Sequence, residues 1–162
     1  MPCIFCLVAT EKANAVRVYE DDDIVIFRDH RPAGRIHLLA IPRQHIESVV
    51  DLTATDVLML EAMKEQALAA VAKLMPDVDP ATIQMGFHKR PFVLVGHLHM
   101  HILHQPFSKL RALLYSDRFP WYVSVDRKIA KLRAKLGGVG SNDDGDREIA
   151  PAEASVAAPA QE

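Results

Sequence analysis

The stretch over residues 96–103, GHLHMHIL, constrains the fold of this chain more than any other part of its sequence. Histidine alternates there with apolar residues, and in an extended strand successive side chains point to opposite faces. The pattern therefore predicts a strand that buries Leu98, Met100 and Ile102 and gathers three imidazoles on its other face. Because imidazole serves in proton transfer, nucleophilic attack and metal binding, this strand predicts a functional site.

The rest of the sequence predicts short strands around one long helix. Alternating or apolar runs between turn residues predict strands over residues 16–19, 24–27, 37–41 and 82–87. Helical spacing of apolar residues predicts a long helix that ends before Pro76 and a closing helix over residues 123–136. With the histidine strand, the fold class is α+β: a five-stranded antiparallel sheet, one long helix and a C-terminal amphipathic helix.

The length and charge of the chain predict one domain and a tail. The 162 residues suffice for one hydrophobic core, which we assign to residues 1–136. Residues 137–162 are acidic, rich in Gly, Ala, Pro and Ser, and lack periodicity, which predicts a disordered tail. Without the tail, the body carries a small excess of basic residues, which favours a small phosphate-bearing ligand over nucleic acid.

The N-terminus and the hydropathy of the chain bear on its location. No charged segment followed by an apolar run opens the sequence, and no stretch reaches the length of a membrane span. We therefore expect no membrane association and a cytoplasmic protein, with the nucleus as a second compartment.

The two cysteines, Cys3 and Cys6, are separated by two residues. A pair at this spacing can share a metal ion or form a tight redox disulfide. Two unrelated small residues are the plain alternative, so the pair alone does not decide between these interpretations.

The segment HLHMHIL matches the His-φ-His-φ-His-φ-φ signature, where φ is apolar, and the chain resembles the histidine triad superfamily of nucleotide hydrolases and transferases. Residues 22–29 and 37–45 are similar to that family's nucleotide-side strands and its His-φ-φ-φ-φ-Pro segment. Residues 85–92 and the pair Trp121-Tyr122 resemble its aprataxin-like branch. The resemblance covers about residues 3–136 and implies a histidine triad fold and a homodimer.

The resemblance also implies an activity and three catalytic residues. His99 would attack the α-phosphorus of a nucleotide and form a covalent nucleotidyl-histidine, which water hydrolyses. His101 would stabilise phosphate charge, and His37 stands where the family has a further active-site histidine. The implied substrates are purine nucleoside phosphoramidates, acyl-AMP or other AMP conjugates, and the product is the nucleoside monophosphate. A neutral imidazole is a competent nucleophile at physiological pH.

For the nucleotide, the resemblance implies base-pocket walls at Ile26 and Phe27 and an acceptor for the ribose hydroxyls at Asp29. A carboxylate that accepts from a diol is sound hydrogen-bond chemistry. His88 would reach the phosphate or the leaving group. The alternative for Asp29 and His88 is ordinary loop polarity.

The resemblance gives the cysteines a partner set as well. Zinc-containing members of the superfamily use a Cys₂His₂ site that includes the first triad histidine, which implies a structural zinc held here by Cys3, Cys6, His45 and His97. Zinc prefers four nitrogen or sulfur ligands in a closed tetrahedron. Reduced thiols without metal are the alternative.

One departure from the family leaves the leaving group open. Family members carry phosphate-contacting serines before the triad, where this chain has Leu94, Val95 and Gly96. A hydrolase of dinucleoside polyphosphates or adenosine phosphosulfate is therefore a second hypothesis. A zinc-stabilised nucleotide-binding or scaffold protein with incidental catalysis is a third, and a hydrolase with all three triad histidines on one catalytic metal is a fourth.

Overall fold

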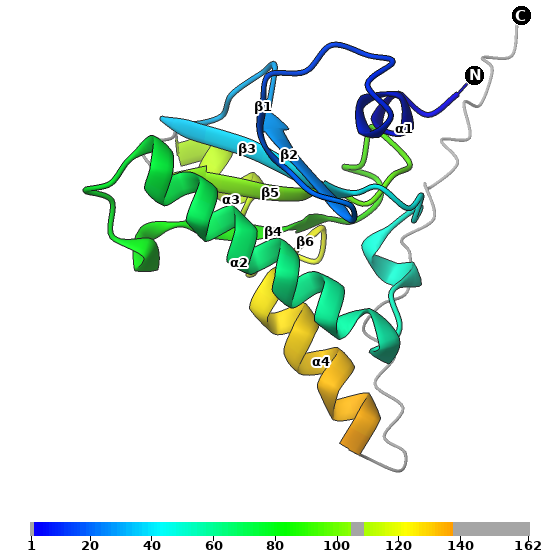
Figure 1. Ribbon diagram of the computed structural model, residues 1–162. Coiled ribbons are helices and arrows are strands. Elements are labelled where there is room, and N and C mark those ends of the chain that lie inside the picture. The colour runs from blue at the N-terminus through cyan, green and yellow to red at the C-terminus, as the bar shows by residue number, and fades with distance from the viewer. Residues whose placement is uncertain (1, 105–108, 138–162) are drawn as a thin grey trace, which may run out of the picture.

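The computed structural model describes residues 2–104 and 109–137. Its centre is an antiparallel sheet of six strands in the order β1-β2-β3-β5-β4-β6 (Figure 1). The strands are β1 (Arg17–Glu20), β2 (Ile24–Arg28), β3 (Ile36–Pro42), β4 (Gln84–His88), β5 (Met100–His104) and β6 (Tyr122–Ser124). The sequence predicted five strands and missed β6, because three residues are too few to show a period of two.

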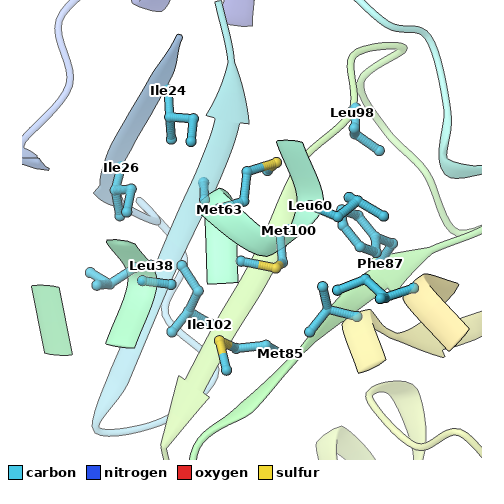
Figure 2. Close-up of a cluster of buried hydrophobic side chains, with 14 of the residues drawn as sticks. Ile24, Ile26, Leu38, Leu60, Met63, Met85, Phe87, Leu98, Met100 and Ile102 are labelled. Carbon is cyan, nitrogen blue, oxygen red and sulfur yellow. The ribbon is translucent and has the colours of Figure 1, made fainter. Parts of the chain in front are cut away.

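Two helices cover one face of the sheet. Helices α2 (Val57–Leu74) and α4 (Val125–Gly137) lie side by side there (Figure 1). Alternate residues of the strands meet them in one apolar cluster, in which Leu60 and Met63 of α2 pack with Leu38, Met100 and Ile102 (Figure 2). Each of these five side chains has no exposed surface. This face therefore supplies most of the hydrophobic stabilisation and holds β5 in place.

The other face of the sheet carries a short N-terminal helix, α1 (Ile4–Ala9). Val8 and Ala9 of α1 pack there on Phe27, Leu39 and Ile41, in a cluster separate from the one under α2. The same face also carries His37 of β3, His88 of β4 and His101 of β5. Since α1 contains Cys6, its packing brings the cysteine segment to the same face as the histidines.

The predicted elements are mostly confirmed, with differences at their ends. The β1–β2 hairpin, β3 and α2 lie where the sequence placed them, as does the closing helix α4. Short 3-10 helices, η1 (Val49–Asp51), η2 (Ala54–Asp56) and η3 (Pro80–Thr82), flank α2, and α3 (Lys109–Leu114) precedes β6. Helix α1 was not predicted, because six residues show too little periodicity.

The histidine strand begins later than its pattern suggests. Ladder pairing of β5 starts at Met100, so two of the triad histidines precede it. The Leu98 N–H donates to the Ile46 carbonyl at 2.6 Å, in the loop after β3, rather than to a neighbouring strand. The predicted alternation still holds, because Leu98, Met100 and Ile102 all lie in the cluster under α2.

The predicted tail lies outside the described residues from residue 138 on, while Gly137 still belongs to α4. Among the residues described, no helix is long and apolar enough to cross a membrane.

Candidate active site and metal centre

The second triad histidine, His99, has its ring orientation set by its own backbone. Its Nδ1–H donates to the His97 carbonyl at 2.7 Å. A carbonyl only accepts, so the proton of the neutral ring is on Nδ1 and the lone pair is on Nε2. Burial lowers the pKa of His99, which keeps the ring neutral at physiological pH. The arrangement leaves a nucleophilic nitrogen at Nε2.

The third triad histidine, His101, is oriented by His37 of the neighbouring strand. The Ala33 N–H donates to His37 Nδ1 at 3.0 Å, so His37 must carry its own proton on Nε2. That Nε2 lies 2.8 Å from His101 Nδ1 and 3.3 Å from Asp29 Oδ2. His37 therefore donates to His101, whose proton is in turn placed on Nε2. The chain of bonds from Ala33 to His101 we call the histidine relay.

The outward end of the relay has no partner in the part of the chain that is described. His101 Nε2 is buried and makes no hydrogen bond there. Burial, together with the neighbouring His99, His88 and His37, lowers the pKa of His101 well below its ordinary value. A neutral, buried N–H without a partner is suited to donate to an oxyanion, and a phosphate oxygen is the candidate that the resemblance supplies.

The predicted nucleotide-side residues do not all lie together. Phe27 and Asp29 lie on the histidine face, where the Phe27 ring is 5.6 Å from that of Phe5, and Asp29 lies beside His37. Ile26 points to the opposite face and is fully buried in the cluster under α2. Because adjacent strand residues alternate, one of the pair Ile26 and Phe27 had to face away. The expectation that Ile26 lines the base pocket is therefore wrong.

His88 lies against His101, but its hydrogen bond gives it a different character from the one expected. Its ring centroid is 4.8 Å from that of His101. The His88 ring also stacks on the Tyr115 ring, at a centroid distance of 4.9 Å. His88 Nε2 donates to the Leu114 carbonyl at 3.1 Å. Burial lowers the pKa of His88 to about 4, so the neutral ring leaves only an acceptor at Nδ1. Such a ring can hold His101 in place, but it has no second N–H for a phosphate.

The sequence analysis did not predict two aromatic residues of this site. Phe5, between the two cysteines, contacts the His99 ring edge-on at a centroid distance of 5.2 Å. Tyr115 packs on the rings of His37, His88 and His101. The motifs specify neither residue, because Phe5 occupies one of the two variable positions between the cysteines and Tyr115 lies outside every motif. Only the fold brings these residues to the histidines.

The first triad histidine, His97, faces the cysteines instead of the relay. Its Nε2–H donates to the Pro42 carbonyl at 2.9 Å, which leaves the Nδ1 lone pair to face Cys3 Sγ at 3.5 Å and Cys6 Sγ at 3.4 Å. Cys6 Sγ lies 3.2 Å from His45 Nδ1. The ligand atoms of Cys3, Cys6, His45 and His97 all lie within 4.8 Å of one another.

This four-residue cluster fits a zinc ion. In a tetrahedral site with ordinary zinc–sulfur and zinc–nitrogen bonds, sulfur and nitrogen ligands are about 3.6 Å apart. The three sulfur–nitrogen separations in the cluster are 3.2, 3.4 and 3.5 Å. The hydrogen bond from His97 Nε2 to a backbone carbonyl is the kind of second contact that orients a metal-binding imidazole.

A second group, Asp29, His37 and His101, also brings three metal-binding side chains together. A metal there would need a lone pair on His37 Nε2, which would force a proton onto Nδ1, against the Ala33 N–H. The relay tautomer therefore opposes a metal at this position. With His97 turned toward the cysteines, the triad also does not converge on one catalytic metal.

A small hollow lies beside His99 on the β4 side. Its lining comes from the loop after β3, from the end of β4 and from the segment that leads into β5: Glu47, Ser48, Val49, Phe87, His88, Val93, His97, Leu98 and His99. Residues 94–96, which have no hydroxyl side chain, lie between Val93 and His97 of this lining. Ser48 is also in the lining, and its Oγ accepts from the Val50 N–H at 3.4 Å.

Comparison with known proteins places the chain in a family. A family model described as "Scavenger mRNA decapping enzyme C-term binding" matches residues 2–113. The chain is also 34% identical over 139 residues to adenosine 5'-monophosphoramidase HINT3 of Mus musculus, covering 81% of each protein. The chain belongs to the histidine triad family. The resemblance stated from the HLHMHIL segment is confirmed.

Solved histidine triad structures agree with the fold. A HIT family hydrolase from Legionella pneumophila superposes with a TM-score of 0.59 at 30% identity, over 64% of this chain and 93% of that one. A zinc-bound histidine triad family protein from Mycobacterium smegmatis gives 0.52 at 25% identity, over 83% and 98%. The histidine triad fold of this chain, with its open antiparallel sheet, is therefore established.

Proposed function

We propose that this histidine triad protein is a hydrolase of AMP conjugates, with purine nucleoside phosphoramidates as its principal substrates. The observation that carries the proposal is the 2.7 Å hydrogen bond from His99 Nδ1 to the His97 carbonyl, which leaves Nε2 as a nucleophile beside the unpartnered N–H of His101. The mouse relative named adenosine 5'-monophosphoramidase supports the substrate class.

The proposed reaction has two displacements at the α-phosphorus. His99 Nε2 forms a bond to phosphorus while the bond to the leaving nitrogen breaks, and the departing amine keeps the bonding electrons and takes up a proton. Water then attacks the same phosphorus, the bond to His99 breaks, and nucleoside monophosphate leaves with a proton released. His101 Nε2–H donates to a phosphoryl oxygen in both steps, which stabilises the charge that develops there.

We propose that Phe27 and Asp29 hold the nucleoside, the ring as a wall and the carboxylate as an acceptor for the ribose hydroxyls. The Asp29 side chain is only 12% exposed, and its Oδ1 accepts from the Arg31 N–H at 2.8 Å. These contacts hold the carboxylate in one orientation, which suits it to accept from the ribose hydroxyls. We also propose a zinc ion at Cys3, Cys6, His45 and His97, where it would fix α1 to the segment that leads into β5. The solved Mycobacterium smegmatis structure described as zinc-bound supports a zinc ion in this fold.

The test is hydrolysis of AMP conjugates by the wild-type protein, H99A and E61Q. We expect release of AMP from a phosphoramidate and a loss of at least about a thousandfold in kcat/KM in H99A. E61Q should not change kcat/KM, because Glu61 of α2 pairs with Arg133 on the other face of the sheet. Radiolabelled AMP should be trapped on the wild type and not on H99A. Full turnover by H99A would contradict the proposal.

Two other functions are separated by the same panel. Faster cleavage of a dinucleoside polyphosphate or adenosine phosphosulfate than of any phosphoramidate would favour the second hypothesis. Nucleotide binding without turnover or trapped AMP would favour a zinc-stabilised binding or scaffold protein.

A homodimer, which sedimentation would detect, stays a prediction, as do the cytoplasmic or nuclear location and the disordered tail.

A further inference from the structure

The helix that contains Cys6 needs support from outside itself. An isolated helix of fewer than about 12 residues is marginal in water, and α1 has six residues. Its N-cap residue, Cys3, makes no capping hydrogen bond through its side chain, and only Val8 and Ala9 of the helix are buried. The position of α1, and with it that of Cys6, therefore depends on contacts with the rest of the chain.

Two arginine side chains bind the C-terminal end of α1. Arg17 Nη2 donates to the Val8 carbonyl at 2.6 Å, and Arg43 Nη1 donates to the Ala9 carbonyl. Carbonyls in the last turn of a helix lack the N–H partners that earlier carbonyls have, and arginine can supply them. The two guanidinium groups therefore fix α1 by its backbone, in addition to the apolar packing of Val8 and Ala9.

Arg43 binds two other parts of the chain at the same time. Its Nε donates to the Asp21 carbonyl at 2.6 Å, in the turn after β1, and its Nη2 donates to Glu20 Oε2 at 3.0 Å. Three nitrogens of one planar group thus each meet a different acceptor. Because the guanidinium directs its N–H groups at fixed angles, a lysine ammonium cannot reproduce this set of contacts.

The place of Arg43 in the chain links these contacts to the proposed zinc site. Arg43 directly follows Pro42, the last residue of β3, and precedes His45 by two residues. The Pro42 carbonyl accepts from His97 Nε2 at 2.9 Å. Arg43 therefore joins the helix of Cys6 to the segment that supplies one histidine ligand and orients the other. The three contacts of its guanidinium involve no ligand atom, so they act whether or not a metal is bound.

We propose that Arg43 is a positioning residue of the proposed zinc site. It holds α1 against the end of β3, so that the cysteines and histidines already lie together when the metal binds. A site whose ligands are held in advance does not lose binding free energy to the ordering of α1. Glu20 assists, because its Oε2 lies 3.0 Å from Arg43 Nη2 and 3.7 Å from Arg17 Nε. The inference rests on the zinc site proposed above and adds a residue outside the ligand set.

The test compares the zinc affinity of the wild type, R43K, E20Q and a control, R133K. The protein is stripped of metal and titrated with zinc against a chromophoric chelator. Residues that orient metal ligands contribute about tenfold or more to affinity, so the zinc Kd should rise by about tenfold in R43K. E20Q removes one partly exposed charge and should raise the Kd by about threefold. R133K changes an arginine of α4 that also pairs with a glutamate, Glu61, and should leave the Kd unchanged.

Hydrogen exchange separates positioning from a general effect on stability. In the zinc-free protein, the amides of Leu7 and Thr10, which donate to carbonyls of α1 and its N-cap, should lose protection in R43K while those of β5 keep it. Cobalt at saturation should give R43K the same tetrahedral absorption spectrum as the wild type, because the ligand set is intact. If Arg43 only stabilised the fold as a whole, the unfolding midpoint would fall while the zinc Kd and the pattern of protection stayed as in R133K.

The outcomes separate this inference from the proposals on which it rests. An R43K protein with the zinc Kd of the wild type, or with α1 as protected as in the wild type, overturns the role of Arg43 alone. A wild type that takes up neither zinc nor cobalt overturns the proposed zinc site itself, and the role of Arg43 falls with it. Neither result depends on turnover, so the proposed hydrolase activity is tested separately.

Discussion

The two histidine clusters of this protein use the same side chain for different chemistry. In the cluster of Cys3, Cys6, His45 and His97, which we propose to hold zinc and call the zinc cluster, His97 gives its Nε2–H to the Pro42 carbonyl. Its Nδ1 lone pair thereby faces both cysteines. In the proposed catalytic cluster of His37, His99 and His101, His99 gives its Nδ1–H to a carbonyl and keeps the lone pair on Nε2. The backbone partner of each ring, rather than the residue type, decides whether the ring nitrogen with the lone pair faces the cysteine sulfurs or the proposed position of the phosphate.

The clusters are also joined through one residue. The imidazole of His97 belongs to the zinc cluster, while its carbonyl accepts the hydrogen bond that orients His99. Phe5, between the cysteines, adds a second link through its edge-on contact with the His99 ring. A change at the cysteines should therefore reach the nucleophile without touching it.

The largest effect that separates the clusters is expected from C6S. Loss of a thiolate ligand should abolish stoichiometric zinc and lower the free energy of unfolding by about 4 kcal/mol when free zinc exceeds its Kd about a thousandfold. Because His97 is then less constrained, kcat should fall as well. Metal analysis, urea unfolding and kinetics on one preparation check this, with E61Q on α2 as control. A C6S protein with wild-type zinc content and stability would show that the cysteines hold no metal.

The sequence predicted the residues of both clusters better than the bonds between them. The alternation around Met100 and the spacing of Cys3 and Cys6 indicated a functional strand and a cysteine pair, because period and spacing are local properties. The roles of the histidines and the full ligand set came from the resemblance to the histidine triad family. The tautomers depend on acceptors that are distant in sequence, as when Pro42 accepts from His97. The mistaken role of Ile26 has a local cause, since strand alternation alone could have assigned it to the face opposite Phe27.

The second prediction concerns the free energy of unfolding in acid, which depends on whether His88 is buried as a neutral ring. Its folded-state pKa is about 4, below the ordinary value of 6.5. Between these values the unfolded chain binds a proton that the folded chain does not, so stability is constant above about pH 6.5 and falls as the pH drops toward 4. From pH 7 to pH 5, His88 should account for a loss of about 2 kcal/mol.

H88F keeps an aromatic ring against Tyr115 and removes the titrating group. Its unfolding free energy, measured in urea at pH 7 and pH 5, should fall by about 2 kcal/mol less than that of the wild type over this interval. Equal falls in H88F and wild type would mean that His88 is protonated as readily in the folded chain as in the unfolded one.

The smallest effect tests the histidine relay itself. In H37A, His101 loses the donor that holds its proton on Nε2, so kcat should fall by about tenfold, or about 1.4 kcal/mol, while zinc content stays constant. H37Q can present an amide N–H to His101 Nδ1 and should recover part of the rate.

A merely structural role for His37 would change stability without changing the tautomer of His101. Nitrogen chemical shifts of the His101 ring distinguish the two, because loss of the relay mixes the Nδ1–H and Nε2–H forms. Shifts that stay at the wild-type position in H37A would show that something other than His37 orients His101.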